Sequence, residues 1–327
     1  MYMERLHWSK NFSMVTEVSI AGDFLYDAIT HLNATENLDN ISGVFRFLYN
    51  ASVGIERLQK ALIIITECES EEHLIEFVES ITTHSLTSLH QRIEKQRKIG
   101  FNSAQIGFLH LLTSFYKNHR YNRFALPNKL NAERDALKKF LKEQGKLTAK
   151  DTPFLATYFD EDSKKFLTNL IGVIAQKYYD NLQDVCRQKN LYSYELQWDS
   201  PAAKIFRFDS KLSAQIADEK TALKELILFL AHITVKKGGF PRYLRTHKPL
   251  NLERASIPEH LHDIINGVIP QSLIDEVATI YEDRFDTNQK RKKRAEIIDP
   301  IGNPYVDWDF RRPLCRLRFR RRDKEEG

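Results

Sequence analysis

The chain is poor in cysteine and in long apolar runs, and each scarcity excludes a class of protein. Its three cysteines, Cys68, Cys186 and Cys315, lie far apart in the 327 residues and form no CxxC pair. This usage predicts neither a disulfide framework nor a zinc site and is typical of a reducing cytosol. No run of about 18 apolar residues occurs, so no membrane span is expected. The N-terminal segment lacks the apolar core of a signal peptide, which favours a cytoplasmic protein.

Several common catalytic motifs are missing as well. The chain contains no GxGxxG, no GxxxxGK[ST], no GxSxG and no HExxH. Nucleotide hydrolysis by a phosphate-binding loop and hydrolysis by a zinc-binding helix are therefore disfavoured. The carboxylate clusters at 69–72 and 160–162 are spaced for helix starts rather than for metal binding. The sequence thus predicts no cofactor and no metal site.

Helical periodicity dominates the first 190 residues, and glycine is scarce. We predict a mainly α fold with a helical bundle over 1–190. The expected helices span about 15–32, 41–67, 70–80, 84–97, 102–117, 132–144 and 161–189.

The pattern changes after Asn190. The segments 191–198 and 204–208 are short, aromatic and partly alternating, which predicts two strands of a β-hairpin. Helices are expected again at 221–235, from 257 and over 270–281, and 314–319 alternates apolar residues with arginine like an edge strand. We therefore predict a smaller helical or α+β region over 191–290 and a basic C-terminal tail over 291–327.

The net charge of +5 is unevenly distributed. Residues 290–294 read KRKKR, and residues 311–322 read RRPLCRLRFRRR. Such clusters attract phosphate backbones through counterion release, so RNA or a nucleotide phosphate is an expected partner. The alternative is a solvated tail that contacts an acidic protein.

The segment 44–66 is apolar on nearly every helical face but carries Glu56, Arg57 and Lys60 in its middle. A helix of this kind should be buried, and buried charges need partners. Glu56 and Lys60 stand four residues apart, so they share a helix face in the favourable order. They form either an internal ion pair or part of a site.

Three segments together resemble the HEPN family of small helical bundles. They are ERLQKAL at 56–62, HSLTSL at 84–89 and the pair Arg120-Tyr121. The resemblance covers about residues 15–126. The family includes RNA-cutting toxins, antiphage effectors and catalytically silent members, so the resemblance implies a fold more directly than an activity. It also implies a homodimer, which brings two copies of the Arg120 segment near one cleft.

HEPN ribonucleases carry an arginine followed after four to six residues by a histidine, and they need no metal. The histidine moves a proton and the arginine holds the scissile phosphate. This spacing occurs at Arg242 and His247 and again at Arg254 and His260. Both are alternative catalytic pairs, but both lie outside the part that resembles the family, and about two such spacings are expected by chance.

The better-placed group is Asn118-His119-Arg120-Tyr121 with Arg123. It offers a proton carrier, two cations and polar donors. The alternative interpretation is structural: the segment is a helix C-terminus, where cations interact favourably with the helix dipole. From across the bundle, His84 and the charged side chains of 56–60 are expected to face this group, with Glu56 orienting Arg120 or His119. The candidate catalytic residues are His119, Arg120, Tyr121 and Glu56, and the candidate substrate-binding residues are Asn118, Arg123, Lys60 and Arg57.

Three functions are consistent with these patterns. The first is a defence or toxin protein that binds RNA and cuts it without a metal, with a cognate antitoxin or defence protein as partner. The second is a non-catalytic HEPN module that binds a nucleotide or a partner protein and regulates an enzyme encoded elsewhere. The third is nucleic-acid binding through the basic C-terminal region alone.

Overall fold

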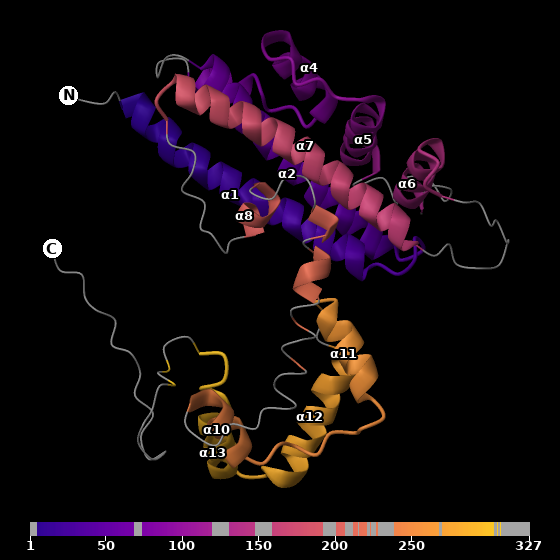
Figure 1. Ribbon diagram of the computed structural model, residues 1–327, viewed down its shortest axis with the longest axis vertical. Coiled ribbons are helices and arrows are strands. Elements are labelled where there is room, and N and C mark those ends of the chain that lie inside the picture. The colour runs from indigo at the N-terminus through magenta and orange to yellow at the C-terminus, as the bar shows by residue number, and fades with distance from the viewer. Residues whose placement is uncertain are drawn as a thin grey trace. The chain divides into compact units, whose positions relative to one another are not determined.

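The computed structural model describes most of the chain as helices (Figure 1). The described residues are 5–68, 74–119, 131–147, 159–191, 201–206, 212–214, 216–220, 223, 227, 239–267, 270–303, 306 and 308. The chain divides into two compact units, Met1–Ala217 and Asp218–Gly327. The described residues include no strand, so the mainly α prediction is confirmed.

The first unit is a helical bundle built on three long helices. These are α1 (Arg5–Ala34), α2 (Ile41–Glu67) and α7 (Glu161–Gln188). Shorter elements complete it: α3 (Leu74–Glu79), α4 (Leu86–Gln96), α5 (Ser103–Ser114), a π-helical turn η1 (Phe115–His119), α6 (Ala132–Glu143) and α8 (Pro201–Phe206). The second unit contains α10 (Gly239–Thr246), α11 (Ile257–Ile265), α12 (Gln271–Arg284) and α13 (Asn288–Ile298).

Helix α2 is the centre of the bundle, because it packs against α1, α4, α5, α6 and α7. Its apolar side chains are buried on several faces, including Phe47, Leu48, Ile55 and Leu62. The prediction that this helix is buried is therefore confirmed. Burial of this kind stabilises the fold by roughly 25 cal/mol for each Å² of apolar surface removed from water.

Local sequence determines where several helices begin. Asn102 and Gln105 form a capping box at the start of α5, each side chain accepting a hydrogen bond from the other's backbone N–H at 2.9 Å. Asp160 Oδ1 accepts from Ser163 N at 2.6 Å at the start of α7. Such caps satisfy backbone donors that the first helical turn leaves unpaired. The predicted starts near residues 102 and 161 are accordingly confirmed.

A buried polar chain joins α2, α4 and α7. Gln59 Nε2 donates to Tyr178 Oη at 2.7 Å and to the Leu86 carbonyl oxygen at 2.9 Å. The Tyr178 hydroxyl in turn lies within hydrogen-bond distance of His90 Nδ1, at 2.9 Å. Burial lowers the pKa of His90 below its ordinary value of 6.5, so the folded protein holds this imidazole neutral.

We expect acid to destabilise the fold through His90. The unfolded chain binds this proton below the ordinary pKa of 6.5, whereas the folded chain resists it. Stability should therefore fall as the pH drops below about 6.5, by at most about 1.4 kcal/mol per pH unit for one histidine. Urea unfolding at pH 7, 6 and 5 measures this slope. His90→Gln should flatten it, and His110→Gln, at an exposed site on α5, should leave it unchanged.

The β-hairpin prediction is wrong where the structure tests it. Lys204–Phe206, the start of the second predicted strand, is the end of helix α8. The remaining residues of that strand, 207–208, and residues 192–198 of the first lie outside the described part. Helix α8 forms because it packs on α1, where Ala202 and Ala203 are completely buried. A contact with a distant helix overrides the weak strand preference of this segment.

This contact requires glycine at position 22 of α1. A Cβ atom there would lie 2.4 Å from Ala202 Cα, closer than side chains ever approach a backbone. Tyr179 of α7 stacks on Phe206 with ring centroids 4.6 Å apart, which holds the other side of α8. The two contacts fix α8 within the first unit.

Two helices of the second unit were not predicted. Helix α10 begins at Gly239, where the sequence suggested a helix end, because Pro241 is tolerated in a first turn. Helix α13 contains KRKKR, so the first part of the predicted basic tail is helical. The segment 309–327, with the second basic cluster and the predicted edge strand, lies outside the described residues. None of the described helices has the length and apolar character needed to cross a bilayer.

Candidate functional site

Glu56 of α2 is the centre of a cluster of charged groups. Its side chain is 11% exposed, and its Oε1 accepts a hydrogen bond from Lys60 Nζ at 2.7 Å. His84 Nδ1 lies 3.1 Å from both oxygens of the same carboxylate. The largely buried carboxylate therefore has two partners, the ammonium group of Lys60 and the imidazole of His84.

The start of α4 positions His84. The next residue, Ser85, is the N-cap of the helix, and its Oγ accepts from Ser88 N at 3.4 Å. Thr87 N donates to Thr113 Oγ1 of α5 at 3.2 Å, and the carbonyl oxygen of Leu86 accepts from Gln59 of α2. The first turn of α4 is thus bonded to two neighbouring helices, which fixes the backbone that carries the imidazole.

An aromatic side chain from η1 completes the cluster. The ring centroid of Tyr116 lies 4.8 Å from that of His84. The ring of Tyr49 stacks on Tyr116, with centroids 6.3 Å apart. Phe115, the first residue of η1, is fully buried against Phe45 with ring centroids 5.3 Å apart. A π-helical turn widens the helix locally, and such turns are frequent at functional sites.

This arrangement can transfer a proton. Because a carboxylate only accepts hydrogen bonds, the nitrogen that faces Glu56 carries a hydrogen, and Nε2 of neutral His84 is then the basic atom. The His84 side chain is 52% exposed, so it is accessible from solvent. Glu56 stabilises the imidazolium that forms when Nε2 takes a proton, as the carboxylate does in a catalytic triad. Lys60 adds a cation beside the same carboxylate.

The residues predicted from sequence are only partly brought together. Glu56 and Lys60 lie in the cluster, whereas Arg57 turns to α1, where Nη1 binds Glu17 Oε2 at 2.6 Å. The backbone of η1 includes Asn118 and His119 and continues from Tyr116. The structure describes no side-chain position for these two residues. Arg120, Tyr121 and Arg123 lie outside the described residues.

The two alternative pairs in the second unit are engaged differently. Arg242 is exposed on α10, and His247 Nδ1 donates to the Tyr243 carbonyl oxygen at 2.8 Å. Arg254 is also exposed, whereas His260 is buried with Nε2 3.5 Å from Glu276 Oε2. His247 is therefore hydrogen-bonded to a group other than Arg242, and the charged group recorded next to His260 is Glu276 rather than Arg254.

Sequence reasoning gave His84 only a supporting place and did not name Tyr116 or Tyr49 as site residues. The available signal was HSLTSL, since a histidine directly before a serine cap stands at a defined helix start. The contact with Glu56 joins residues 28 positions apart and depends on how α2 and α4 pack.

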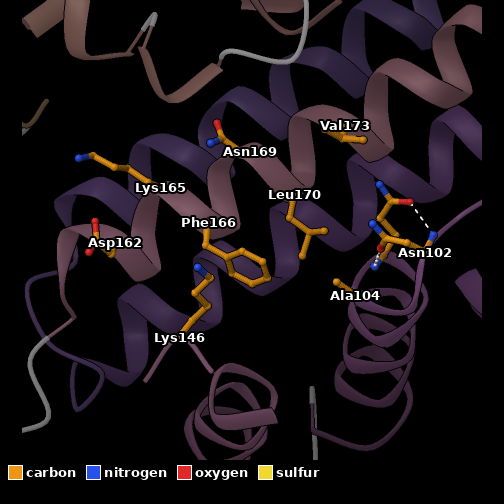
Figure 2. Close-up of a pocket in the computed structure, with 10 residues that line it drawn as sticks. Asn102, Ala104, Lys146, Asp162, Lys165, Phe166, Asn169, Leu170 and Val173 are labelled. Atoms are coloured by element: carbon orange, nitrogen blue, oxygen red, sulfur yellow. Dashed lines mark hydrogen bonds between the residues drawn. The ribbon is translucent and has the colours of Figure 1, made fainter. Parts of the chain in front are cut away.

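A second candidate site is a groove of about 600 Å³ between the start of α5 and the first half of α7 (Figure 2). Phe166 and Leu170 form its apolar middle. Lys146 Nζ lies 5.6 Å from the centre of the Phe166 ring. Asn102 lies at one end, and Asp162 and Lys165 lie at the other (Figure 2). The groove therefore combines an aromatic surface with two ammonium groups.

In the part of the chain that the structure describes, no group of three or more histidine, cysteine, aspartate or glutamate side chains has the arrangement of a metal site. Comparison with protein-family models, with curated proteins and with solved structures finds no match for this chain.

Proposed function

We propose that the protein is a HEPN-type defence or toxin protein that binds RNA and cleaves it without a metal, with His84 and Glu56 as its proton-transfer pair. The observation that carries this proposal is the contact of His84 Nδ1 with both oxygens of Glu56, at 3.1 Å each. A purely structural ion pair does not require an imidazole that is half exposed. Proton transfer to a substrate does.

RNA supplies its own nucleophile, which makes such a pair sufficient to start the reaction. Nε2 of His84 takes the proton of a ribose 2′-hydroxyl as the 2′-oxygen attacks the adjacent phosphorus. The bond from phosphorus to the 5′-oxygen of the next nucleotide breaks, and that oxygen takes a proton from solvent water. The imidazolium of His84 then returns its own proton to solvent. The products are a 2′,3′-cyclic phosphate and a free 5′-hydroxyl. Cations near the phosphate, Lys60 among them, stabilise its developing charge.

The proposal is tested with purified full-length protein, total RNA and tRNA in excess EDTA. We expect discrete fragments that end in 2′,3′-cyclic phosphate. Intact RNA after incubation with folded protein would contradict the cleavage proposal and leave only binding. Fragments that form only when a divalent metal is added would contradict the metal-free step.

The groove favours a second function, the non-catalytic binding of a nucleotide. Lysine ammonium groups bind phosphate, and a nucleobase stacks on an aromatic face. Lys146 and Lys165 line the same groove as Phe166, so one ligand can contact all three side chains. This arrangement supports a regulatory module that senses a small nucleotide.

We expect Lys146→Ala to weaken nucleotide binding roughly ten-fold, which corresponds to about 1.4 kcal/mol. Isothermal titration calorimetry with AMP and with ATP measures this change. Lys139→Ala is the matched control, because Lys139 is 79% exposed on α6 and is not part of the groove lining. Equal affinity of the two variants, or no heat with wild-type protein, would contradict nucleotide binding in the groove.

A further inference from the structure

The second unit contains two basic helices that are bonded to each other. Tyr243 Oη of α10 donates to the Ile297 carbonyl oxygen of α13 at 2.8 Å. Arg294 Nη1 of α13 donates to the Lys248 carbonyl oxygen, just after α10, at 3.0 Å. Figure 1 shows the two helices side by side. Cations that are distant in the sequence therefore share one part of this unit.

Both helices carry cations with few compensating acids. Residues 239–252 include Arg242, Arg245 and Lys248, all exposed, and no aspartate or glutamate. Residues 290–294 of α13 are five consecutive cations, of which the first four are exposed. We use the name α10–α13 basic face for the surface that eight side chains form around these two helices, with the five consecutive cations of α13 distributed around that helix. They are Arg242, Arg245, Lys248, Lys290, Arg291, Lys292, Lys293 and Arg294.

Helix α13 forms in spite of repulsion within this face. Like charges three or four residues apart destabilise a helix by roughly 0.2–0.5 kcal/mol per pair, and residues 290–294 contain several such pairs. Lys290 is paired with Asp286 at 2.7 Å, and Arg291 donates to the Phe285 carbonyl oxygen. Lys292 and Lys293 form no ion pair with any described residue. A polyanion bound to these side chains would supply counter-charge that the described residues do not.

The composition of α13 distinguishes between classes of polyanion. Its first seven residues, 288–294, read NQKRKKR and include no apolar side chain. A protein interface needs an apolar centre, and a membrane-surface helix needs an apolar face. A nucleic-acid backbone needs neither, because release of its counterions provides most of the binding free energy.

We propose that the α10–α13 basic face binds the phosphate backbone of RNA without sequence preference. The choice of RNA over other nucleic acids rests on the proposed function, whereas the choice of a phosphate backbone rests on the charges of this face alone. The second unit then holds the RNA chain by its phosphates, and the chemistry is left to groups elsewhere.

The test measures the affinity of the full-length protein for fluorescently labelled single-stranded RNA of two unrelated sequences. Fluorescence anisotropy is followed over a range of salt concentrations in EDTA, in a His84→Ala background so that the RNA stays intact. A variant replaces Arg242, Arg245, Lys292 and Lys293 by Gln. We expect at least ten-fold weaker binding of both RNAs by this variant. For this variant, the slope of log affinity against log salt concentration should be smaller in magnitude by up to about three, at roughly 0.7 for each lost phosphate contact.

A charge-matched control replaces four exposed cations of the first unit by Gln: Lys95, Lys98, Lys139 and Arg187. It loses the same net charge, so a general electrostatic effect would weaken both variants equally and overturn the proposal. Unchanged affinity of the basic-face variant would overturn it as well, as would tighter binding to anionic phospholipid vesicles than to RNA. Cleavage and binding are read separately, so wild-type protein that binds RNA through this face but never cuts it contradicts only the proposed function.

Discussion

Replacing His84 by alanine should lower the rate of RNA cleavage in EDTA by roughly 100- to 10,000-fold, the contribution of a general acid–base group. The fold should persist, because the His84 side chain is 52% exposed and the turn that carries it is held by backbone and serine contacts. Initial rates on tRNA, measured beside thermal unfolding of the same samples, separate lost chemistry from lost structure.

Glu56→Gln tests whether the carboxylate acts through the imidazole. The amide keeps the shape of the side chain but not the negative charge that stabilises imidazolium, so the rate should fall by about ten-fold or more. Glu56 is a positioning residue in this scheme, and the variant should also change the pH dependence of the rate. If Glu56 had a purely structural role, the pH dependence of the cleavage rate would be the same in this variant as in the wild type.

His110→Ala is the matched control for both variants, because His110 is an exposed histidine on α5. It should cleave RNA at the wild-type rate. If His84→Ala retained full activity, the catalytic group would lie elsewhere, and His119→Ala and Arg120→Ala would be the next variants. Arg120 is part of the Arg-Tyr pair that resembles the HEPN family, and His119 is the candidate proton carrier beside it.

Gly22→Ala should give the largest loss of stability from the addition of one methyl group. The new Cβ would lie 2.4 Å from Ala202 Cα and 2.5 Å from Ala202 Cβ, so α8 must move away from α1. Overpacking of this kind costs up to about 3 kcal/mol, and the better helix propensity of alanine returns about 1 kcal/mol. We expect the free energy of unfolding to fall by roughly 1–2 kcal/mol, with an unchanged urea m-value.

Gly107→Ala provides the comparison for this prediction. Its new Cβ would meet Phe140 Cε2 at 3.3 Å, the edge of a side chain that can shift slightly. Stability should stay the same or rise by up to about 1 kcal/mol through helix propensity. If both glycine variants were equally stable, α8 would not depend on close contact with α1.

Sequence periodicity was sufficient for the long helices of the first unit, because their apolar patterns are extended and two of them have clear start signals. The apolar pattern of 41–67 matches α2 at both ends, and Asn40 accepts a hydrogen bond from Gly43 N at its start. Helix α1 extends further towards the N-terminus than the apolar pattern, which began at Val15.

Two helices of the second unit, α10 and α13, were harder to predict, each for its own reason. Helix α13 contains five consecutive cations, which no hydrophobic template identifies as a helix. For α10, the Gly-Gly and Pro241 signals mark a helix end or a helix start equally well. In the first unit, by contrast, the segment that failed was 204–206, which has aromatic and β-branched residues and is helical where it packs against α1.

The candidate site was partly predictable for a similar reason. A charge in an apolar helix must find a partner, which identified Glu56 and Lys60 from sequence alone. The contact of Glu56 with His84 depends on the register between α2 and α4, and the pattern of a single sequence carries no information on that register. Tyr116 was unpredictable because an α-helical projection places it differently from the π-helical turn that is present.

That turn also makes the spacing between α5 and the cluster sensitive to chain length. A π-helical turn holds one residue more than the α-helical turn it replaces, and each residue of an α-helix rotates the following side chains by about 100°. Removing one residue from Phe115–His119 would let α5 continue as a regular helix and would swing Tyr116 away from His84. A relative that lacks this extra residue would keep the helical bundle and lose the contact of Tyr116 with His84. A one-residue gap in an alignment would therefore distinguish proteins with this contact from proteins of the same fold without it.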